Sequence, residues 1–220
     1  MLYKVMRDDG TTAYGRDGWD LPRGSRRGSW RRVTGPLIPC ENGLHVCREQ
    51  DLISWIQGER LYEAEARGDQ VDGGDKLVVR EARLVRRVAG WNETTLRLFA
   101  ADCAERALLG EQKAGREPDR RLWAAVKAAR DYAHGLISQA ELAAARAAAW
   151  AAAGAAARDA AWDAVGAAAG AAAWDAAWDA AGAAAGAAAW YAVGAAAGAA
   201  EREWQSNRLS EYLSGKRGTA

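Results

Sequence analysis

The chain has 220 residues, in which 30 lysines and arginines balance 29 aspartates and glutamates. This length allows one large or two small domains, and the near-zero net charge excludes the overall positive charge of a general polyanion-binding protein. The odd number of cysteines and a start without the apolar core of a signal peptide favour a cytoplasmic protein.

The first part of the chain, residues 1–92, has the pattern of a small mixed α/β domain. Its apolar residues alternate or cluster in short runs that predict strands over residues 2–6, 30–33, 43–47, 60–68 and 76–88. The run "EQDLISWI" at residues 49–56 has helical spacing. The segment "DQVDGGD" between the last two strands has the composition of a turn.

From residue 93 the pattern is helical. Residues 93–136 predict connecting helices, the first ending at Gly110 and the second with Pro118 and Asp119 at its start and His134-Gly135 at its end. "SQAE" at residues 138–141 is a capping box that opens an alanine-rich tract over 137–215. A final helix is predicted to close at Gly215, followed by a disordered tail over 216–220.

Tryptophan, glycine or arginine occupies every fourth position from Arg146 to Arg202. Because an α-helix repeats every 3.6 residues, each step of four overshoots a turn by about 40° and the row winds around a helix. Either several short helices pack with Trp over Gly or Ala, or the tract is one long rod. We favour packed helices, since a rod would leave its tryptophans in water. The expected interaction residues are Trp150, Trp162, Trp174, Trp178 and Trp190.

The genetic code offers another origin for this row. Codons for Trp, Gly and Arg can differ at the first base alone, so a duplicated twelve-base unit that decays by point mutation would give the same alternation. A position that accepts an aromatic ring, a cation or no side chain is not a tightly packed core site. This alternative predicts a repeat array with a loosely specified outer surface.

Residues 180–200 carry no charge and have the length of a membrane span. They consist mainly of alanine and glycine and contain almost none of the Leu, Ile, Phe and Val that favour insertion. We therefore expect no membrane contact.

Three groups of residues are candidates for metal binding, phosphate binding or acid–base catalysis. Cys40, His45 and Cys47 are weak candidates for zinc ligands, against the alternative of a strand with a buried thiol, and we expect no metal and no cofactor. An arginine cluster around Trp30 could bind phosphate or single-stranded nucleic acid, but the neutral chain favours a solvated loop. Its members are Arg23, Arg26, Arg27, Arg31 and Arg32.

The helical tract also contains Asp159, Asp163, Asp175 and Asp179 in two i, i+4 pairs. Such a pair can hold a metal or transfer protons, but no helical histidine lies nearby in the sequence. Solvated acids are the simpler interpretation.

The first 90 residues resemble a domain of unknown function found in phage and actinobacterial proteins. The motifs that carry the resemblance are Tyr3-Lys4, "GLHVC" at 43–47, "EARGDQV" at 65–71 and Asp75-Lys76. The helical half resembles alanine-rich modules labelled as immunity proteins in actinobacterial genomes, through "AADCAERAL", "AARDYAHGLIS" and "WQSNRLSEYL". These resemblances imply a role in binding a partner.

The order of motifs in the first domain is also similar to that of NAD-dependent ADP-ribosyltransferases. That resemblance implies a cleft containing Lys4, His45, Tyr62 and Glu65. It provides the enzymatic alternative.

The sequence therefore predicts an α+β fold, in which a small mixed α/β domain precedes an all-α repeat region. We expect a non-enzymatic phage or actinobacterial accessory protein that acts by protein–protein interaction or self-association, in immunity or counter-defence. The alternatives are the ADP-ribosyltransferase, and nucleic-acid binding through Arg26, Arg27 and Arg31, which the neutral charge disfavours.

Overall fold

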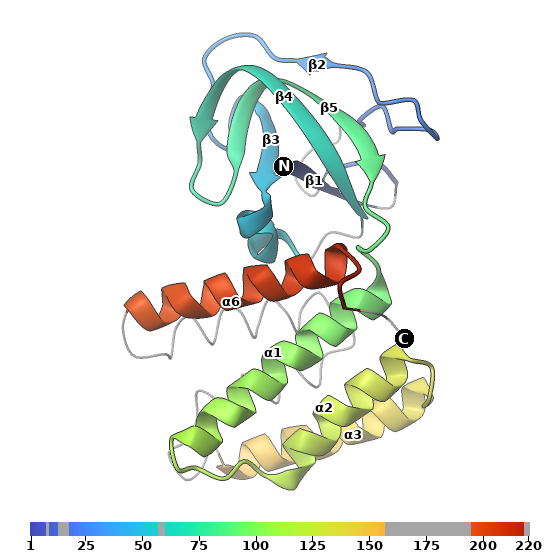
Figure 1. Cartoon of the computed structure of the whole chain (residues 1–220), viewed down its shortest axis with the longest axis vertical. Helices are drawn as coiled ribbons and strands as arrows, with labels where there is room; N and C mark the ends of the chain where they lie inside the picture. Colours follow the sequence, from blue (N-terminus) through green and yellow to red (C-terminus); the bar gives the residue numbers. More distant parts are fainter. Residues whose placement is uncertain (8, 13–17, 57–59, 157–194, 218–220) are drawn as a thin grey trace. The chain divides into compact units, whose positions relative to one another are not determined.

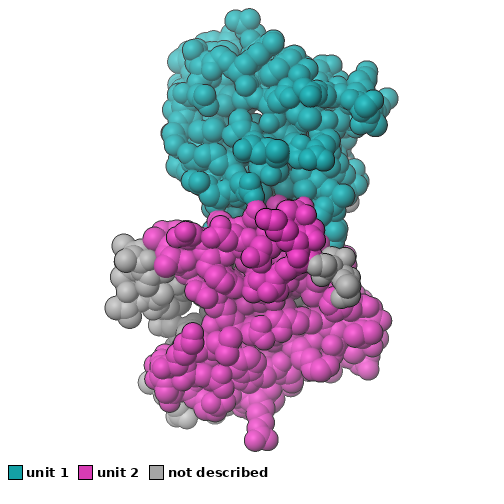
Figure 2. Space-filling view, viewed as in Figure 1, with its two compact units in different colours: residues 1–92 teal, residues 93–220 magenta. Residues whose placement is uncertain are grey.

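The computed structural model describes residues 1–7, 9–12, 18–56, 60–156 and 195–217. The chain divides into two compact units, Met1–Asn92 and Glu93–Ala220 (Figure 2). The strands lie in the first unit and the α-helices in the second (Figure 1). The α+β fold class predicted from the sequence is confirmed.

The first unit is built on an antiparallel sheet that closes on itself. Its strands are β1 (Leu2–Met6), β2 (Arg31–Arg32), β3 (Leu44–Arg48), β4 (Arg60–Asp72) and β5 (Leu77–Arg87). They lie in the order β2-β5-β3-β1-β4, and β4 pairs again with β5. The strands β1, β3, β5 and β4 therefore form a ring, and closure leaves them few unpaired backbone groups.

Successive side chains of a strand point to opposite faces, so alternate residues fill the interior of the ring. The buried interior cluster consists of Met6, Trp19, Leu44, Val46, Tyr62, Ala64, Val79, Ala82 and Leu84. The ring has few strands and a narrow interior, so alanines on β4 and β5 make space for the larger rings of Trp19 and Tyr62.

The segment that follows β3 is a 3₁₀-helix, η1 (Glu49–Trp55), rather than the α-helix predicted over 49–56. Two side chains fix this short segment. The carboxylate of Asp51 accepts hydrogen bonds from the Arg48 backbone N–H at 3.1 Å and from Arg48 Nε at 2.6 Å, and Trp55 Nε1 donates to the Asp75 carbonyl at 2.8 Å. Because these contacts fix both ends of a short segment, the segment adopts the tighter 3₁₀ geometry, which occurs mainly in short helices.

The hairpin of β4 and β5 is longer than predicted. The sequence suggested a strand ending at residue 68 and a turn over 69–75, but β4 pairs with β5 as far as Asp72 opposite Leu77. Gly68 adopts a φ of 77°, and the register shifts between Arg67 and Gln70. This bulge absorbs an extra residue of β4 and lets the pairing with β5 continue to Asp72.

The second unit contains α1 (Glu93–Lys113), α2 (Arg120–Ala133), α3 (Gln139–Ala156) and α6 (Ala195–Leu213). Helix α1 packs against α2 and α6, and α2 packs against α3. None of the helices within the described ranges is long and apolar enough to cross a bilayer.

The predicted helix boundaries are mostly confirmed. Asp119 caps α2 by accepting the Arg121 N–H at 2.8 Å. In the capping box, Ser138 N donates to Glu141 Oε2 at 2.7 Å, and Glu141 N donates to Ser138 Oγ at 3.3 Å. After α6, Gly215 has a φ of 70° and terminates the helix, as predicted.

The predicted stop of α1 at Gly110 is wrong. The helix continues through Gly110 to Lys113, and the left-handed residue that ends it is Gly115, with a φ of 78°. The Arg116 N–H closes the turn on the Glu111 carbonyl at 3.0 Å. The helix therefore ends where two features coincide: Gly115 adopts the left-handed conformation, and the next residue, Arg116, donates its N–H back to the Glu111 carbonyl.

Replacing these two glycines by alanine should shift stability in opposite directions. A Cβ atom at Gly110 or Gly115 would meet no other atom within 4 Å. Gly110→Ala should therefore stabilise the chain by up to about 1 kcal/mol through helix propensity. Gly115→Ala should destabilise it by roughly 1–2 kcal/mol, because alanine is strained at positive φ. Urea unfolding followed by circular dichroism measures both, and changes of the same sign would contradict this boundary.

Candidate functional site

Lys4 is the most unusual residue of the ring interior. It lies on the same face of β1 as Leu2 and Met6, which belong to the interior side. Its Nζ donates to the His45 carbonyl at 2.7 Å and lies 5.3 Å from the centroid of the Trp19 ring. No carboxylate in the described part of the chain forms an ion pair with it. Burial of the ammonium group lowers the pKa of Lys4 to about 8.

The four residues of the enzymatic alternative divide between two sides of the sheet. Tyr62 is directly opposite Lys4 in the pairing of β1 with β4, and it belongs to the interior cluster. Glu65 lies between Ala64 and Ala66 and forms ion pairs with Arg27 and Arg83 on the outer side. The structure brings Lys4 and Tyr62 together and separates Glu65 from them.

The His45 side chain faces away from the interior residues Leu44 and Val46. Its Nε2 accepts a hydrogen bond from the Cys40 backbone N–H at 3.1 Å. Burial lowers the pKa of His45, with further contributions from the charges of Lys4 and Lys76, so the neutral imidazole is favoured.

The zinc candidates differ strongly in accessibility. Cys40 is exposed, whereas Cys47 is buried and its Sγ lies 3.5 Å from the Tyr3 carbonyl oxygen. Burial raises the pKa of the Cys47 thiol to about 12, which disfavours the thiolate that a metal requires. Among the residues the structure describes, no three His, Cys, Asp or Glu side chains are grouped as metal ligands.

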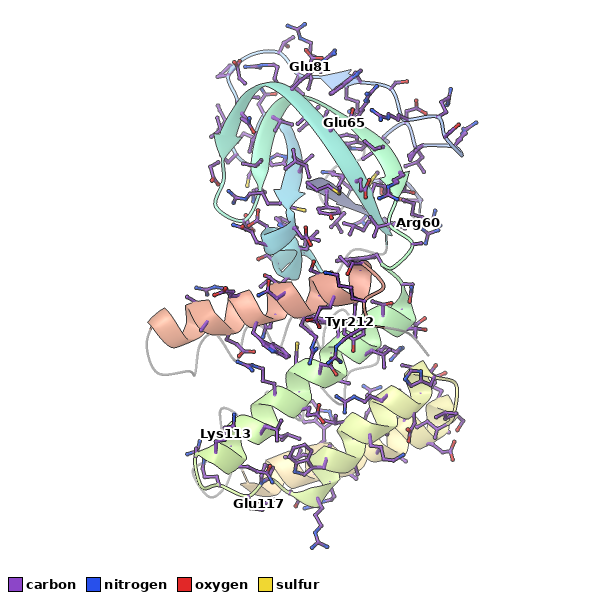
Figure 3. The ribbon with its side chains drawn as sticks, in the orientation of Figure 1. Arg60, Glu65, Glu81, Lys113, Glu117 and Tyr212 are labelled. Atoms are coloured by element: carbon purple, nitrogen blue, oxygen red, sulfur yellow. The ribbon has the colours of Figure 1, made fainter. Side chains whose placement is uncertain are left out.

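The arginine-rich loop contributes to a charged surface on the outside of the ring, which we call the arginine wall. It consists of Arg27, Trp30, Arg32, Glu65, Arg67, Glu81 and Arg83. The guanidinium carbons of Arg67 and Arg83 lie 4.1 and 4.7 Å from the centroid of the Trp30 ring. The labelled carboxylates Glu65 and Glu81 come from β4 and β5 (Figure 3).

Two of the predicted arginines have other local partners. Arg26 lies 3.6 Å from the Asp20 carboxylate, and Arg31 Nη1 donates to the Gly18 carbonyl at 2.7 Å. Sequence reasoning found the loop arginines but missed Arg67 and Arg83. The sequence could have indicated them, because both occupy polar positions in strands whose apolar and polar residues alternate.

The helical unit contains a buried acidic residue that the sequence did not single out. Asp102 on α1 accepts hydrogen bonds from Arg130 Nη2 at 2.8 Å, the Tyr212 hydroxyl at 2.9 Å and Arg217 Nη1 at 3.1 Å. Arg208 Nε forms an ion pair with it at 3.2 Å. Figure 3 labels Tyr212, which belongs to α6. One carboxylate thus links α1, α2, α6 and the residues after α6.

The predicted tryptophan row is described only in part. Trp150 on α3 is 51% exposed. Trp162, Trp174, Trp178 and Trp190 lie outside the described residues, as do the four aspartates of the tract.

No family model, curated protein or solved structure that was compared with the chain matches it. The function must therefore be inferred from the chain's own geometry. Three features are available for this: the ring interior around Lys4, the arginine wall, and the helical unit with its exposed tryptophan.

Replacing Lys4 by methionine should change the pH dependence of stability. The pKa of Lys4 is about 8 in the folded chain and 10.5 in the unfolded chain. Between pH 8 and pH 10.5 the unfolded chain therefore binds more protons than the folded chain. Relative to Lys4→Met, the wild type should therefore gain roughly 3 kcal/mol of stability as the pH rises from 8 to 10.5, because the variant lacks this titration. Urea unfolding at both ends of that range measures it. A difference between variant and wild type that stays constant with pH would contradict the lowered pKa of Lys4.

Removing Asp102 should destabilise the helical unit strongly. Asp102→Ala leaves several guanidinium groups without their buried partner, which should cost about 3–5 kcal/mol. Tyr212→Phe removes one hydrogen bond and should cost about 1 kcal/mol. Thermal unfolding of the two variants measures the ratio, and equal effects would show that Asp102 is not the centre of this network.

Proposed function

We propose that this chain is a non-enzymatic accessory protein that acts by helix-to-helix contact, and that a second copy of the chain is its partner. The phage or actinobacterial setting and the role in immunity or counter-defence follow from the resemblances of the two halves, and the cytoplasmic location follows from the cysteine content and the N-terminal composition. The contact itself is argued from helix α3.

The exposure of the fourth-position row changes along α3. Arg146, the first residue of the row, is partly buried, and Trp150 is 51% exposed; Leu142, four residues before the row begins, is buried. Burial lowers the pKa of Arg146, as does the charge of Arg97 from α1. Steps of four residues carry the row from the packed side of the helix to its solvent side, because each step overshoots a turn by about 40°.

The exposed Trp150 is the observation that carries the proposal. A solvent-exposed tryptophan presents a large apolar surface, and tryptophan is enriched among the residues that dominate binding energy. Around it the helix presents alanines, such as Ala147 and Ala151, which let another helix approach closely. A tryptophan ridge and an alanine groove are complementary, so each copy offers both halves of the contact.

Trp150→Ala should weaken self-association. If Trp150 is a central contact, its removal should raise the dissociation constant by roughly thirtyfold, which corresponds to about 2 kcal/mol. Sedimentation equilibrium of the full chain over a range of concentrations measures this.

Leu136→Ala is the matched control, because Leu136 is 72% exposed in the same unit but does not belong to the row. The control should associate like the wild type. A monomeric wild type, or equal loss in both variants, would overturn the proposal.

A further inference from the structure

The arginine wall carries more positive charge than its own carboxylates neutralise. Glu65 forms ion pairs with Arg27 and Arg83, both at 2.6 Å. Glu81 pairs with Arg67 at 2.6 Å and with Arg32 at 3.8 Å. Four guanidinium groups therefore share two carboxylates, which leaves an excess of two positive charges on this surface.

The wall also retains hydrogen-bond donors. Arg67 and Arg83 each reach a single carboxylate oxygen through Nε and Nη2. Within the described ranges, neither Nη1 has a hydrogen-bond partner. A guanidinium has five N–H donors in a planar fork that fits phosphate as well as carboxylate. The Arg67 side chain is 56% exposed, so its free donor is accessible, whereas the Arg83 side chain is only 25% exposed. Arg32 is the most exposed cation of the wall, at 71%.

Trp30 places an aromatic ring among these cations. The ring is partly exposed and contacts the guanidinium groups of Arg67 and Arg83. Surfaces that bind single strands combine cations for the backbone with planar groups on which bases stack. An acidic peptide would match the charge but would leave the ring unused.

We infer that the arginine wall is a binding surface for single-stranded nucleic acid, whose phosphates contact Arg27, Arg32, Arg67 and Arg83 and whose bases stack beside Trp30. This surface belongs to the first unit alone, and its function does not depend on the association proposed for α3. The neutral charge of the whole chain does not oppose it, because the excess is local.

Fluorescence anisotropy of a labelled oligothymidine of about 12 nucleotides, added to the full chain, tests this inference. The affinity should fall as salt rises from about 50 to 200 mM, as expected when phosphate contacts release counterions. The double variant Arg32→Ala/Arg67→Ala should bind at least tenfold more weakly and reduce the salt slope by roughly 1.4, which corresponds to two lost phosphate contacts. Trp30→Leu should weaken binding about tenfold with little change in that slope.

The matched control is Arg86→Ala/Arg116→Ala, which removes the same charge at exposed positions outside the wall. It should bind like the wild type. Arg32→Gln serves as a second variant, because Arg32 is the most exposed arginine of the wall and its pairing with Glu81 is long. This change should leave the fold intact and still weaken binding.

Three results would overturn the inference. The first is the absence of oligothymidine binding at low salt. The second is an equal loss in the wall and control variants, and the third is tighter binding of a polyglutamate peptide than of the oligonucleotide.

Discussion

The pairing of β4 with β5 is the interaction on which the first unit depends. It closes the ring, and it therefore decides which side chains become interior and which form the outer surface. Ala64 and Leu84 meet on the inside, whereas Glu65 and Arg83 meet on the outside. The inward-facing Lys4 and the arginine wall are thus two consequences of one hairpin.

The helical unit depends on a different constraint, the buried carboxylate of Asp102. A buried charge that lost its partners would be strongly destabilising, so the helices that supply Arg130, Arg208 and Tyr212 must hold their positions around α1. Glu105 and Glu211 complete the network by pairing with Arg130 and Arg208. Alanine offers little side-chain volume, so a polar network of this kind supplies geometric specificity that the small apolar residues cannot.

Sequence reasoning succeeded where the signal is local. The caps at Asp119 and Ser138 and the stop at Gly215 depend on residues within a few positions of each other, and all three are confirmed. The predicted end of α1 at Gly110 was wrong, because a glycine does not end a helix unless the residues that follow it close the turn. The length of β4 was underestimated because its extension depends on β5.

The candidate sites show the same division between local and distant information. Lys4 was placed on the first strand from its neighbours, but its burial depends on ring closure. Arg27 was visible in the loop, yet its partner Glu65 lies 38 positions away. Pairings over such distances cannot be read from one sequence, because many acids are equally available to each arginine.

The net charge of the chain also says nothing about such pairings, because a sum over all residues does not show which charged side chains become neighbours. The sequence holds almost equal numbers of acidic and basic residues, and a solvated arginine loop follows if they mix evenly. Folding does not mix them evenly. The outward positions of β4 and β5 bring two arginines and two glutamates beside Arg27, Trp30 and Arg32, and the local balance becomes positive. A neutral chain can therefore present a cationic surface, and it is this local field, falling off over about 10 Å at moderate salt, that a charged partner encounters.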